Sequence, residues 1–282
     1  MLVYIKLLAL SLVQDSVIFK PRPSGIQAIK TASEYGFKDA SEEIITTEDG
    51  EQIHCWVEKP SNPSKPYIVF FHGNTGHLGD VGKPKWDEEK IDRSYRINFL
   101  KTMEKHGYGF IAVSHRGYGK STGKPSEEGF VKDIKAVAEL IKERNLKIII
   151  SGESLGAFSA LTLMQQMEYS EDKPLGVVLI APFSNLEEKA YETHPEFRRF
   201  DAKKYLRYGF DNKKIISETN FKGRILILHP QQDKTTGNYH SEILLGEGRK
   251  RGLDMKLVIL QNYGHVTWDA EVVLKYLSQE IH

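Results

Sequence analysis

Short apolar runs alternate along this chain with longer segments of helical periodicity. A continuous apolar run is expected for a strand that is buried on both faces, and apolar residues spaced three and four apart are expected for an amphipathic helix. The runs predict strands at residues 67–71, 109–114, 146–150, 176–180, 224–228 and 256–260, and helices at residues 95–105, 126–144, 157–167 and 266–281. This alternation predicts an α/β fold with a mainly parallel central sheet and helices on both faces.

Three segments fall outside this alternation. Residues 44–47 and 52–58 are strand-like runs on either side of Glu48-Asp49-Gly50, which predicts a hairpin. Residues 75–93 are polar and predict a long surface loop. Residues 187–220 are rich in Tyr, Phe, Arg and Lys and fall between two expected strands. We interpret them as a small helical cap over the functional site; the alternative is an unusually long crossover.

The N-terminus is apolar over residues 1–13, apart from Lys6 and Ser11. As a helix it would be about 20 Å long, shorter than the ~30 Å hydrocarbon core of a bilayer. Three interpretations stay open: an anchor that uses residues 1–19 at a membrane surface, a weak membrane span, or a helix packed on the domain. We expect residues 1–39 to be a lead-in to a domain at 40–282, and the protein to be cytoplasmic or peripherally membrane-associated.

Composition excludes several classes of function. The net charge is +1, from 39 basic and 38 acidic residues, which gives no electrostatic footprint for nucleic acid. Cys55 is the single cysteine, so no intrachain disulfide can form, as is usual in a reducing compartment. No pair of His or Cys residues has the spacing of a zinc site, and the glycine motifs of nucleotide sites are incomplete. We therefore expect neither a metal nor a cofactor.

Candidate chemistry begins with Gly152-Glu153-Ser154-Leu155-Gly156, between the expected strand at 146–150 and the expected helix at 157–167. A G-x-S-x-G sequence between a strand and a helix is the context of a nucleophile elbow. The two glycines let the strand and the helix approach closely. The pattern predicts that the Ser154 hydroxyl lies exposed at the carboxyl edge of the sheet.

A serine nucleophile needs a base and an acid that orients the base. His265 follows Gly264 just past the last expected strand, and Asp233 follows the strand at 224–228. Their order after Ser154 is the order of hydrolases with this elbow. We predict His265 as the base and Asp233 as the acid. The rival acid is Glu187 or Glu188, which follow the strand at 176–180.

The oxyanion of the reaction also needs backbone N–H donors. The residue after the nucleophile, Leu155, is expected to supply one of them. The second is expected from Asn74, in the loop His72-Gly73-Asn74-Thr75-Gly76 that follows the strand at 67–71. We interpret His72 as a structural brace of this loop.

These motifs together resemble the α/β-hydrolase superfamily over roughly residues 40–282. Residues 116–121 (RGYGKS) and 123–129 (GKPSEEG) are similar to the branch of small serine hydrolases homologous to the fungal bud-emergence protein and its animal α/β-hydrolase-domain relatives. The resemblance implies an esterase, lipase or acyl-thioesterase, often with an N-terminal membrane anchor. The chain departs from that pattern at residues 79–93, which resemble an insertion, and at residues 234–237, where relatives carry a Val-Pro pair.

The leading hypothesis is a serine hydrolase that cleaves an acyl ester or thioester through an acyl-enzyme. Aromatic residues of the expected cap favour a moderate to long acyl chain, namely Tyr191, Phe197, Phe200, Tyr205 and Tyr208. One alternative is a proline-type aminopeptidase with the same fold, in which Glu187, Glu188 or Glu192 would bind a free amino group. Another is a non-catalytic ligand-binding protein.

Overall fold

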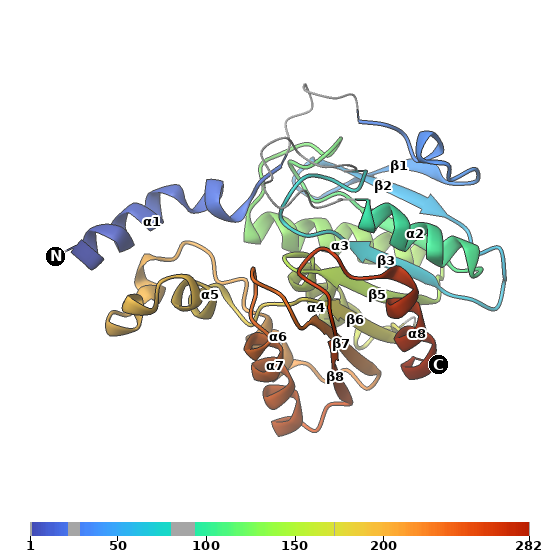
Figure 1. The fold of residues 1–282 in the computed structure, drawn as a ribbon. Helices are drawn as coiled ribbons and strands as arrows, with labels where there is room; N and C mark the ends of the chain where they lie inside the picture. The colour runs from blue at the N-terminus through green and yellow to red at the C-terminus, as the bar shows by residue number, and fades with distance from the viewer. Residues whose placement is uncertain (1, 22–28, 80–93, 172, 282) are drawn as a thin grey trace.

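A single twisted sheet forms the centre of the computed structural model, which describes residues 2–21, 29–79, 94–171 and 173–281 (Figure 1). Within these residues the sheet has eight strands in the order β1-β2-β4-β3-β5-β6-β7-β8. β1 and β2 pair antiparallel, β2 also runs antiparallel to β4, and the strands from β4 to β8 are parallel to one another. The strands are β1 (Ser41–Thr46), β2 (Gln52–Glu58), β3 (Tyr67–Phe71), β4 (Gly109–Val113), β5 (Ile148–Glu153), β6 (Gly176–Ile180), β7 (Arg224–Pro230) and β8 (Met255–Leu260).

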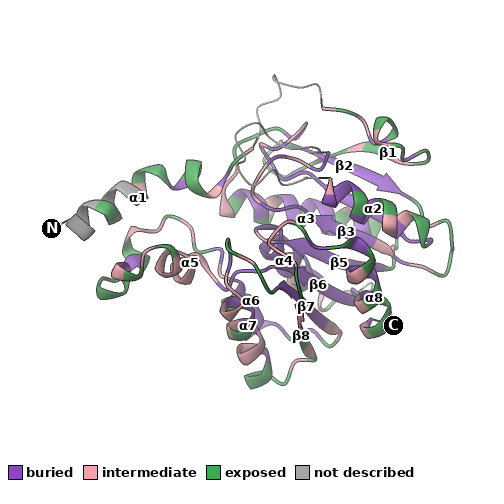
Figure 2. Cartoon of the chain, in the orientation of Figure 1, coloured by how far each residue is buried: buried purple, intermediate pink, exposed green. Residues whose placement is uncertain are grey.

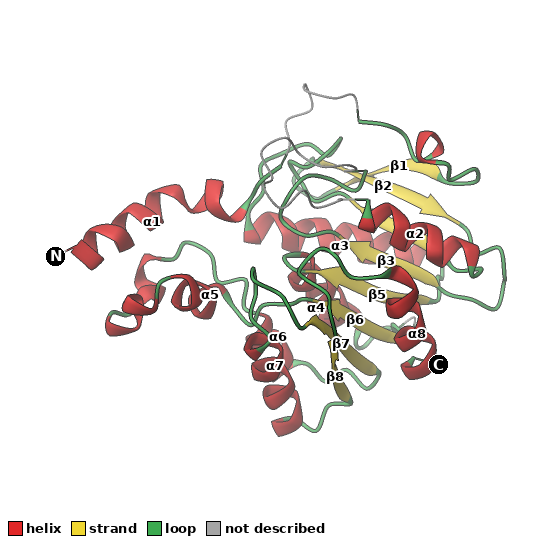
Figure 3. Cartoon of the chain, viewed as in Figure 1, coloured by secondary structure: helices red, strands yellow, loops and turns green. Residues whose placement is uncertain are grey.

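Helices cover both faces of this sheet, as Figure 3 shows. The helices of the described residues are α1 (Leu2–Ile18), α2 (Tyr95–Lys105), α3 (Glu127–Glu143), α4 (Gly156–Met167), α5 (Leu186–Thr193), α6 (Asn212–Glu218), α7 (Tyr239–Lys250) and α8 (Ala270–Glu280). Side chains of α3, α4, α6 and α7 share one core with Val69 and Phe71 of β3. Side chains of α2 and α8 share the other core with Ile68 and Phe70. Successive β3 side chains thus point to opposite faces and both are buried (Figure 2), which confirms the predicted α/β-hydrolase fold class.

The observed elements differ from the expected ones at two places that matter for the site. β5 continues to Glu153, so the first two residues of the elbow motif still belong to the strand. α8 begins at Ala270 because the Asp269 side chain accepts the Glu271 N–H as its cap, which leaves residues 266–269 in the loop after His265.

Helix α7 was missed by the sequence pattern. Its sequence contains Gly246 and Gly248, which are unfavourable in a helix interior and hide the periodicity. The structure explains the second glycine, because a Cβ at Gly248 would lie 1.9 Å from the Met255 Sδ of β8. Glycine at this position lets the Met255 side chain of β8 pack directly against the backbone of α7.

The cap segment lies between β6 and β7, where it was expected, and comprises α5, two short 3-10 helices at Pro195–Arg199 and Ala202–Tyr205, and α6. Helix α1 lies beside these elements rather than on the sheet (Figure 1), and Lys6 forms an ion pair with Glu196 at 3.0 Å. None of the helices in the described residues has the length and apolarity of a membrane-crossing segment. Of the expected insertion at 79–93, residues 80–93 lie outside the described residues.

Candidate active site

Ser154 occupies a sharp turn between β5 and α4, with a left-handed backbone φ of 51°. A non-glycine residue in this region is strained, and such strain clusters at functional sites. The flanking glycines are required by packing. A Cβ at Gly152 would lie 2.3 Å from the carbonyl oxygen of Gly156, and a Cβ at Gly156 would lie 2.2 Å from that of Phe71. The turn therefore has the geometry that the elbow motif predicts.

The structure brings Ser154, His265 and Asp233 together in one chain of hydrogen bonds. The distance from Ser154 Oγ to His265 Nε2 is 3.1 Å, and the distance from His265 Nδ1 to Asp233 Oδ2 is 2.6 Å. A carboxylate only accepts hydrogen bonds, so Nδ1 carries the proton and Nε2 is left as the acceptor for the serine hydroxyl. Asp233 is fully buried, and the His265 side chain is 13% exposed. The loops that carry them are joined where Gln232 N–H donates to the Tyr263 carbonyl at 2.8 Å.

The Asp233 carboxylate is held by more than the histidine. Burial opposes its charge, but the hydrogen bond to His265 and the Thr235 and Thr236 N–H groups, both at 2.8 Å from Oδ1, hold the pKa of Asp233 below its usual value. The loop at residues 234–237, where the chain departs from the resembling branch, thus supplies two backbone donors to this carboxylate.

The other candidate histidines and the rival acids have no hydrogen bond or ion pair with Ser154 within the described residues, although His229 Nε2 lies 3.5 Å from Asp233 Oδ2. His72 is fully buried under the loop after β3, where His115 Nε2 donates to its carbonyl oxygen at 2.9 Å, and burial holds its pKa well below the usual value. His229 contacts Ser241. Glu187 accepts from the Tyr191 hydroxyl at 2.8 Å, and Glu188 pairs with Arg198 at 3.0 Å. Neither glutamate has a hydrogen bond or ion pair with His265 within the described residues.

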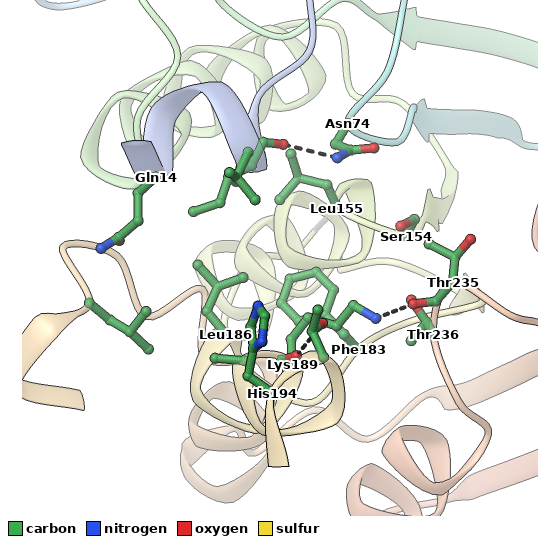
Figure 4. Close-up of a pocket in the computed structure, with 15 residues that line it drawn as sticks. Gln14, Asn74, Ser154, Leu155, Phe183, Leu186, Lys189, His194, Thr235 and Thr236 are labelled. Carbon is green, nitrogen blue, oxygen red and sulfur yellow. Dashed lines mark hydrogen bonds between the residues drawn. The ribbon is translucent and has the colours of Figure 1, made fainter. Parts of the chain in front are cut away.

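The two expected oxyanion donors, Leu155 and Asn74, line one cavity together with Ser154. Leu155 is the N-cap of α4, so its N–H belongs to the helix end where backbone donors lack an intrahelical acceptor. Asn74 lines the same cavities as Ser154 (Figure 4). Its carbonyl accepts from the Tyr118 hydroxyl at 2.9 Å, and its side-chain Nδ2 donates to the Ile18 carbonyl at 3.0 Å. Backbone and side chain of Asn74 are thereby fixed.

Sequence reasoning missed the buried ion pair beside the nucleophile. Glu153 is 1% exposed, and Arg96 Nε donates to its Oε2 at 2.9 Å. Tyr95 OH donates to its Oε1 at 2.6 Å. Burial disfavours the carboxylate, yet Arg96 and these hydrogen bonds hold the pKa of Glu153 below its usual value.

Arg96 joins this pair to the loop after β3. Its Nη1 donates to the carbonyl oxygens of Thr75 and His77, at 2.9 and 3.1 Å. In the sequence, the only indication of this ion pair was the carboxylate of Glu153, at a position of the G-x-S-x-G motif where any residue is accepted. Its partner lies 57 residues away along the chain, so no local pattern connects the two.

Two cavities meet at Ser154. One, of about 220 Å³, has mostly apolar walls from α1, Leu155 and the cap, and its lining includes Val17, Ile18, Leu155, Phe183, Leu186 and Leu206 (Figure 4). The other, of about 570 Å³, is the more polar of the two, and its lining includes Lys20, Arg96, Glu153, Gln232, Lys234 and Thr267. Ser154, Asn74 and Thr235 line both cavities. A bound molecule can therefore place an apolar part on one side of the serine and a polar part on the other.

Comparison with known proteins agrees with the observed fold. A family model described as serine aminopeptidase S33 matches residues 92–218. The esterase Pf2001 of Pyrococcus furiosus superposes with a TM-score of 0.67 at 18% identity, over 94% of this chain and 99% of that one. The chain belongs to the α/β-hydrolase superfamily.

Curated relatives of this α/β-hydrolase include animal α/β-hydrolase-domain proteins, as the resemblance implied. Human Protein ABHD12B is 30% identical over 193 residues, 64% of this chain and 49% of that protein. The lysophosphatidylserine lipase ABHD12 of Xenopus tropicalis is 32% identical over 142 residues, 50% of this chain and 33% of that protein. The chain thus spans half or less of the length of these relatives. The family match and the relatives support a hydrolase of lipase or esterase type.

Removing one partner of the buried ion pair should separate its structural from its chemical role. We expect Arg96→Met to lower the free energy of unfolding by about 3–5 kcal/mol, because Glu153 is left buried without its counter-charge. The double variant Arg96→Met/Glu153→Gln should recover part of that loss, since Gln still accepts from Tyr95. Urea unfolding measures the free energy of unfolding of both variants. If the proposed hydrolase activity holds, the double variant should hydrolyse esters more slowly than wild type, because the carbonyl oxygens of Thr75 and His77 have lost Arg96 as their donor. A kcat equal to that of wild type would show that the pair serves stability alone.

The acid assignment is tested by neutralising Asp233 without changing its shape. Asp233→Asn should lower kcat by roughly 10⁴-fold, because an amide favours the wrong tautomer of His265. Glu188→Gln is the matched control and should stay near wild type. Steady-state ester hydrolysis compares them. Near-normal turnover by Asp233→Asn together with a collapse in Glu188→Gln would move the acid to the cap.

Proposed function

We propose that the protein is a serine hydrolase that cleaves an acyl ester or thioester through an acyl-enzyme. The observation that carries the proposal is the 3.1 Å contact between Ser154 Oγ and His265 Nε2, on a serine held at a left-handed φ where two cavities meet. A serine with only a structural role would not need a strained backbone. It would also not need a histidine nitrogen beside its hydroxyl, in a ring that a buried carboxylate orients.

In this proposal Ser154 Oγ attacks the acyl carbonyl carbon while its proton moves to His265 Nε2. Asp233 keeps the imidazole oriented and stabilises its positive charge. The N–H groups of Leu155 and Asn74 hold the oxyanion. The bond to the leaving oxygen or sulfur then breaks as Nε2–H protonates it. A water molecule then attacks the acyl-enzyme by the same steps, with His265 again accepting the proton. This attack releases the carboxylic acid and restores Ser154.

The chemistry of the two cavities suggests how the substrate lies. Apolar walls from Val17, Leu186 and Leu206 suit an acyl chain, because burying each CH₂ contributes about 0.8 kcal/mol. The polar cavity suits the alcohol or thiol, and Lys20 and Lys234 favour a leaving group with negative charge. Since ABHD12 of Xenopus tropicalis is named a lysophosphatidylserine lipase, monoacyl lipids with a polar head are the first substrates to test.

An aminopeptidase is the second candidate, because the matching family model is described as serine aminopeptidase S33. Such an enzyme needs a free carboxylate to bind the substrate's amino group. Glu187 and Glu188 are engaged by Tyr191 and Arg198. Glu192 accepts the Gly237 N–H at 2.7 Å and pairs with Lys189, so these carboxylates are already committed within the fold. A non-catalytic binding protein would have no need of the oriented serine.

Labelling with a fluorophosphonate probe tests the hydrolase directly. Wild-type protein should be labelled covalently, and Ser154→Ala should not be. Hydrolysis rates would then be compared for short and long p-nitrophenyl esters, acyl thioesters, lysophospholipids and aminoacyl amides. We expect esters or thioesters with chains of about eight carbons to exceed aminoacyl amides by at least tenfold. Absent labelling would end the hydrolase proposal, and a preference for amides would favour the aminopeptidase.

We also propose that α1 contacts a membrane surface. Its sequence is apolar over residues 1–13, and the described side chains of Leu12 and Val13 are 81% and 47% exposed. Exposed apolar groups on a helix beside a cavity favour docking on lipid. Flotation with phosphatidylcholine and phosphatidylserine vesicles should carry the full chain upward, and Leu12→Asp/Val13→Asp should reduce the floated fraction several-fold. Equal flotation of both would contradict the contact.

A further inference from the structure

The end of α1 is tied to the cap by reciprocal polar contacts. Gln14 is 1% exposed; its Nε2 donates to the Tyr205 carbonyl at 2.7 Å, and its Oε1 accepts the Arg207 N–H at 2.8 Å. Asp15 accepts from Arg207 Nη1 at 3.0 Å and from the Tyr208 hydroxyl at 2.8 Å. A buried amide with both ends satisfied specifies one docking position for the helix.

Phe19 then fixes the chain as it leaves the helix. The ring is 5% exposed and lies 5.8, 5.5 and 5.9 Å from the rings of Phe130, Tyr208 and Phe210. Burying an aromatic side chain of this size contributes roughly 1.5–3 kcal/mol. Residues 14–20 are therefore part of the folded domain, although they precede the segment that resembles the hydrolases.

Backbone hydrogen bonds connect this segment to the loop that carries Asn74. Lys20 N–H donates to the Asn74 carbonyl at 3.0 Å, and Gly76 N–H donates to the Lys20 carbonyl at 3.0 Å, as in a short parallel bridge. Asn74 Nδ2 donates to the Ile18 carbonyl at 3.0 Å (Figure 4). Three bonds thus hold the loop from the N-terminal side, while Arg96 holds it from the sheet side.

The same segment closes one side of the apolar cavity. Gln14, Val17 and Ile18 line it together with Ser154 and the cap residues, and Figure 4 shows α1 facing the cap across the cavity. Without residues 14–20, this cavity would lack a wall and the Asn74 loop would lose its bridge.

We propose that residues 14–20 are a working part of the active site, in which the Lys20 backbone positions the oxyanion loop and the Val17 and Ile18 side chains set the acyl-chain length that the cavity accepts. Lys20 is a positioning residue, since it acts through Asn74. The inference rests on the proposed function, because it gives the cavity an acyl chain and Asn74 an oxyanion. It assigns to the N-terminal segment a role in turnover and specificity that is independent of any membrane contact.

Two consequences can be measured separately. An oxyanion donor that is displaced loses transition-state stabilisation, so kcat falls while ground-state binding changes little; loss of a whole donor costs about 10²–10³-fold. A change in the cavity wall instead alters the preference among chain lengths. A segment that only packs against the domain would change thermal stability and neither of these quantities.

The bridge is tested with Lys20→Pro against Lys20→Ala. Both lose the lysine ammonium, but only proline loses the N–H that donates to Asn74. We expect Lys20→Pro to show a kcat for p-nitrophenyl butyrate at least tenfold below that of Lys20→Ala, with KM values within about threefold. Circular dichroism and thermal unfolding establish that both are folded. Equal kcat values in folded variants would overturn the positioning role.

The wall is tested with Val17→Trp and Ile18→Ala, which should shift chain-length preference in opposite directions. The ratio of kcat/KM for p-nitrophenyl octanoate to that for the butyrate should fall at least fivefold in Val17→Trp and rise in Ile18→Ala. Leu12→Trp is the matched control, because Leu12 lies on the same helix but is 81% exposed and outside the cavity lining. Its ratio should match wild type.

The chain-length measurements remain informative if Lys20→Pro fails to fold. Wild-type turnover of the same esters tests the proposed function by itself. Ester turnover by wild type, combined with octanoate-to-butyrate ratios in Val17→Trp and Ile18→Ala equal to that of Leu12→Trp, would overturn the specificity role and leave the hydrolase assignment standing.

Discussion

The buried pair of Glu153 and Arg96 is the contact on which the candidate site depends. A carboxylate at 1% exposure next to the nucleophile would be costly alone, and Arg96 removes that cost while also donating to Thr75 and His77. The pair therefore links the elbow at the end of β5 to the loop after β3. This charged contact, together with the hydrogen bonds with Ile18 and Lys20, holds the Asn74 loop beside the serine.

The acid side of the site is stabilised in a comparable way from the cap. Lys189 of α5 donates to the Thr235 carbonyl, and Glu192 accepts the Gly237 N–H, so the loop of Asp233 is attached to α5 at two points. The same loop gives Asp233 two N–H donors. The cap thus fixes the loop of Asp233, the proposed acid, and also forms a wall of the apolar cavity. The proposed acid and the proposed acyl-chain site are therefore attached to the same segment.

Much of the fold could be predicted from the sequence because buried strands and amphipathic helices have local signatures. β3, β6 and α2 begin and end where the pattern places them, and Ser126 caps α3 by accepting the Gly129 N–H. Ser154, Asp233 and His265, which hydrogen bonds join in the structure, could be proposed as a site because each follows an expected strand, and the carboxyl ends of parallel strands meet at one edge. Helix α7 was missed because Gly246 and Gly248 hide its periodicity, and only Gly248 lies against β8.

The sequence by itself determined the elements, their alternation and which polar residues reach the active edge of the sheet, because these follow from hydrophobic periodicity and chain order. Only the tertiary structure decided how the site is held. It paired Glu153 with Arg96 across 57 residues, and it placed Gln14 against Arg207 across 193. The same packing tied residues 14–20, which follow the apolar N-terminal run, to the cap and to the Asn74 loop. Such contacts join residues that are distant along the chain, and their partners are set by the packing of the whole molecule.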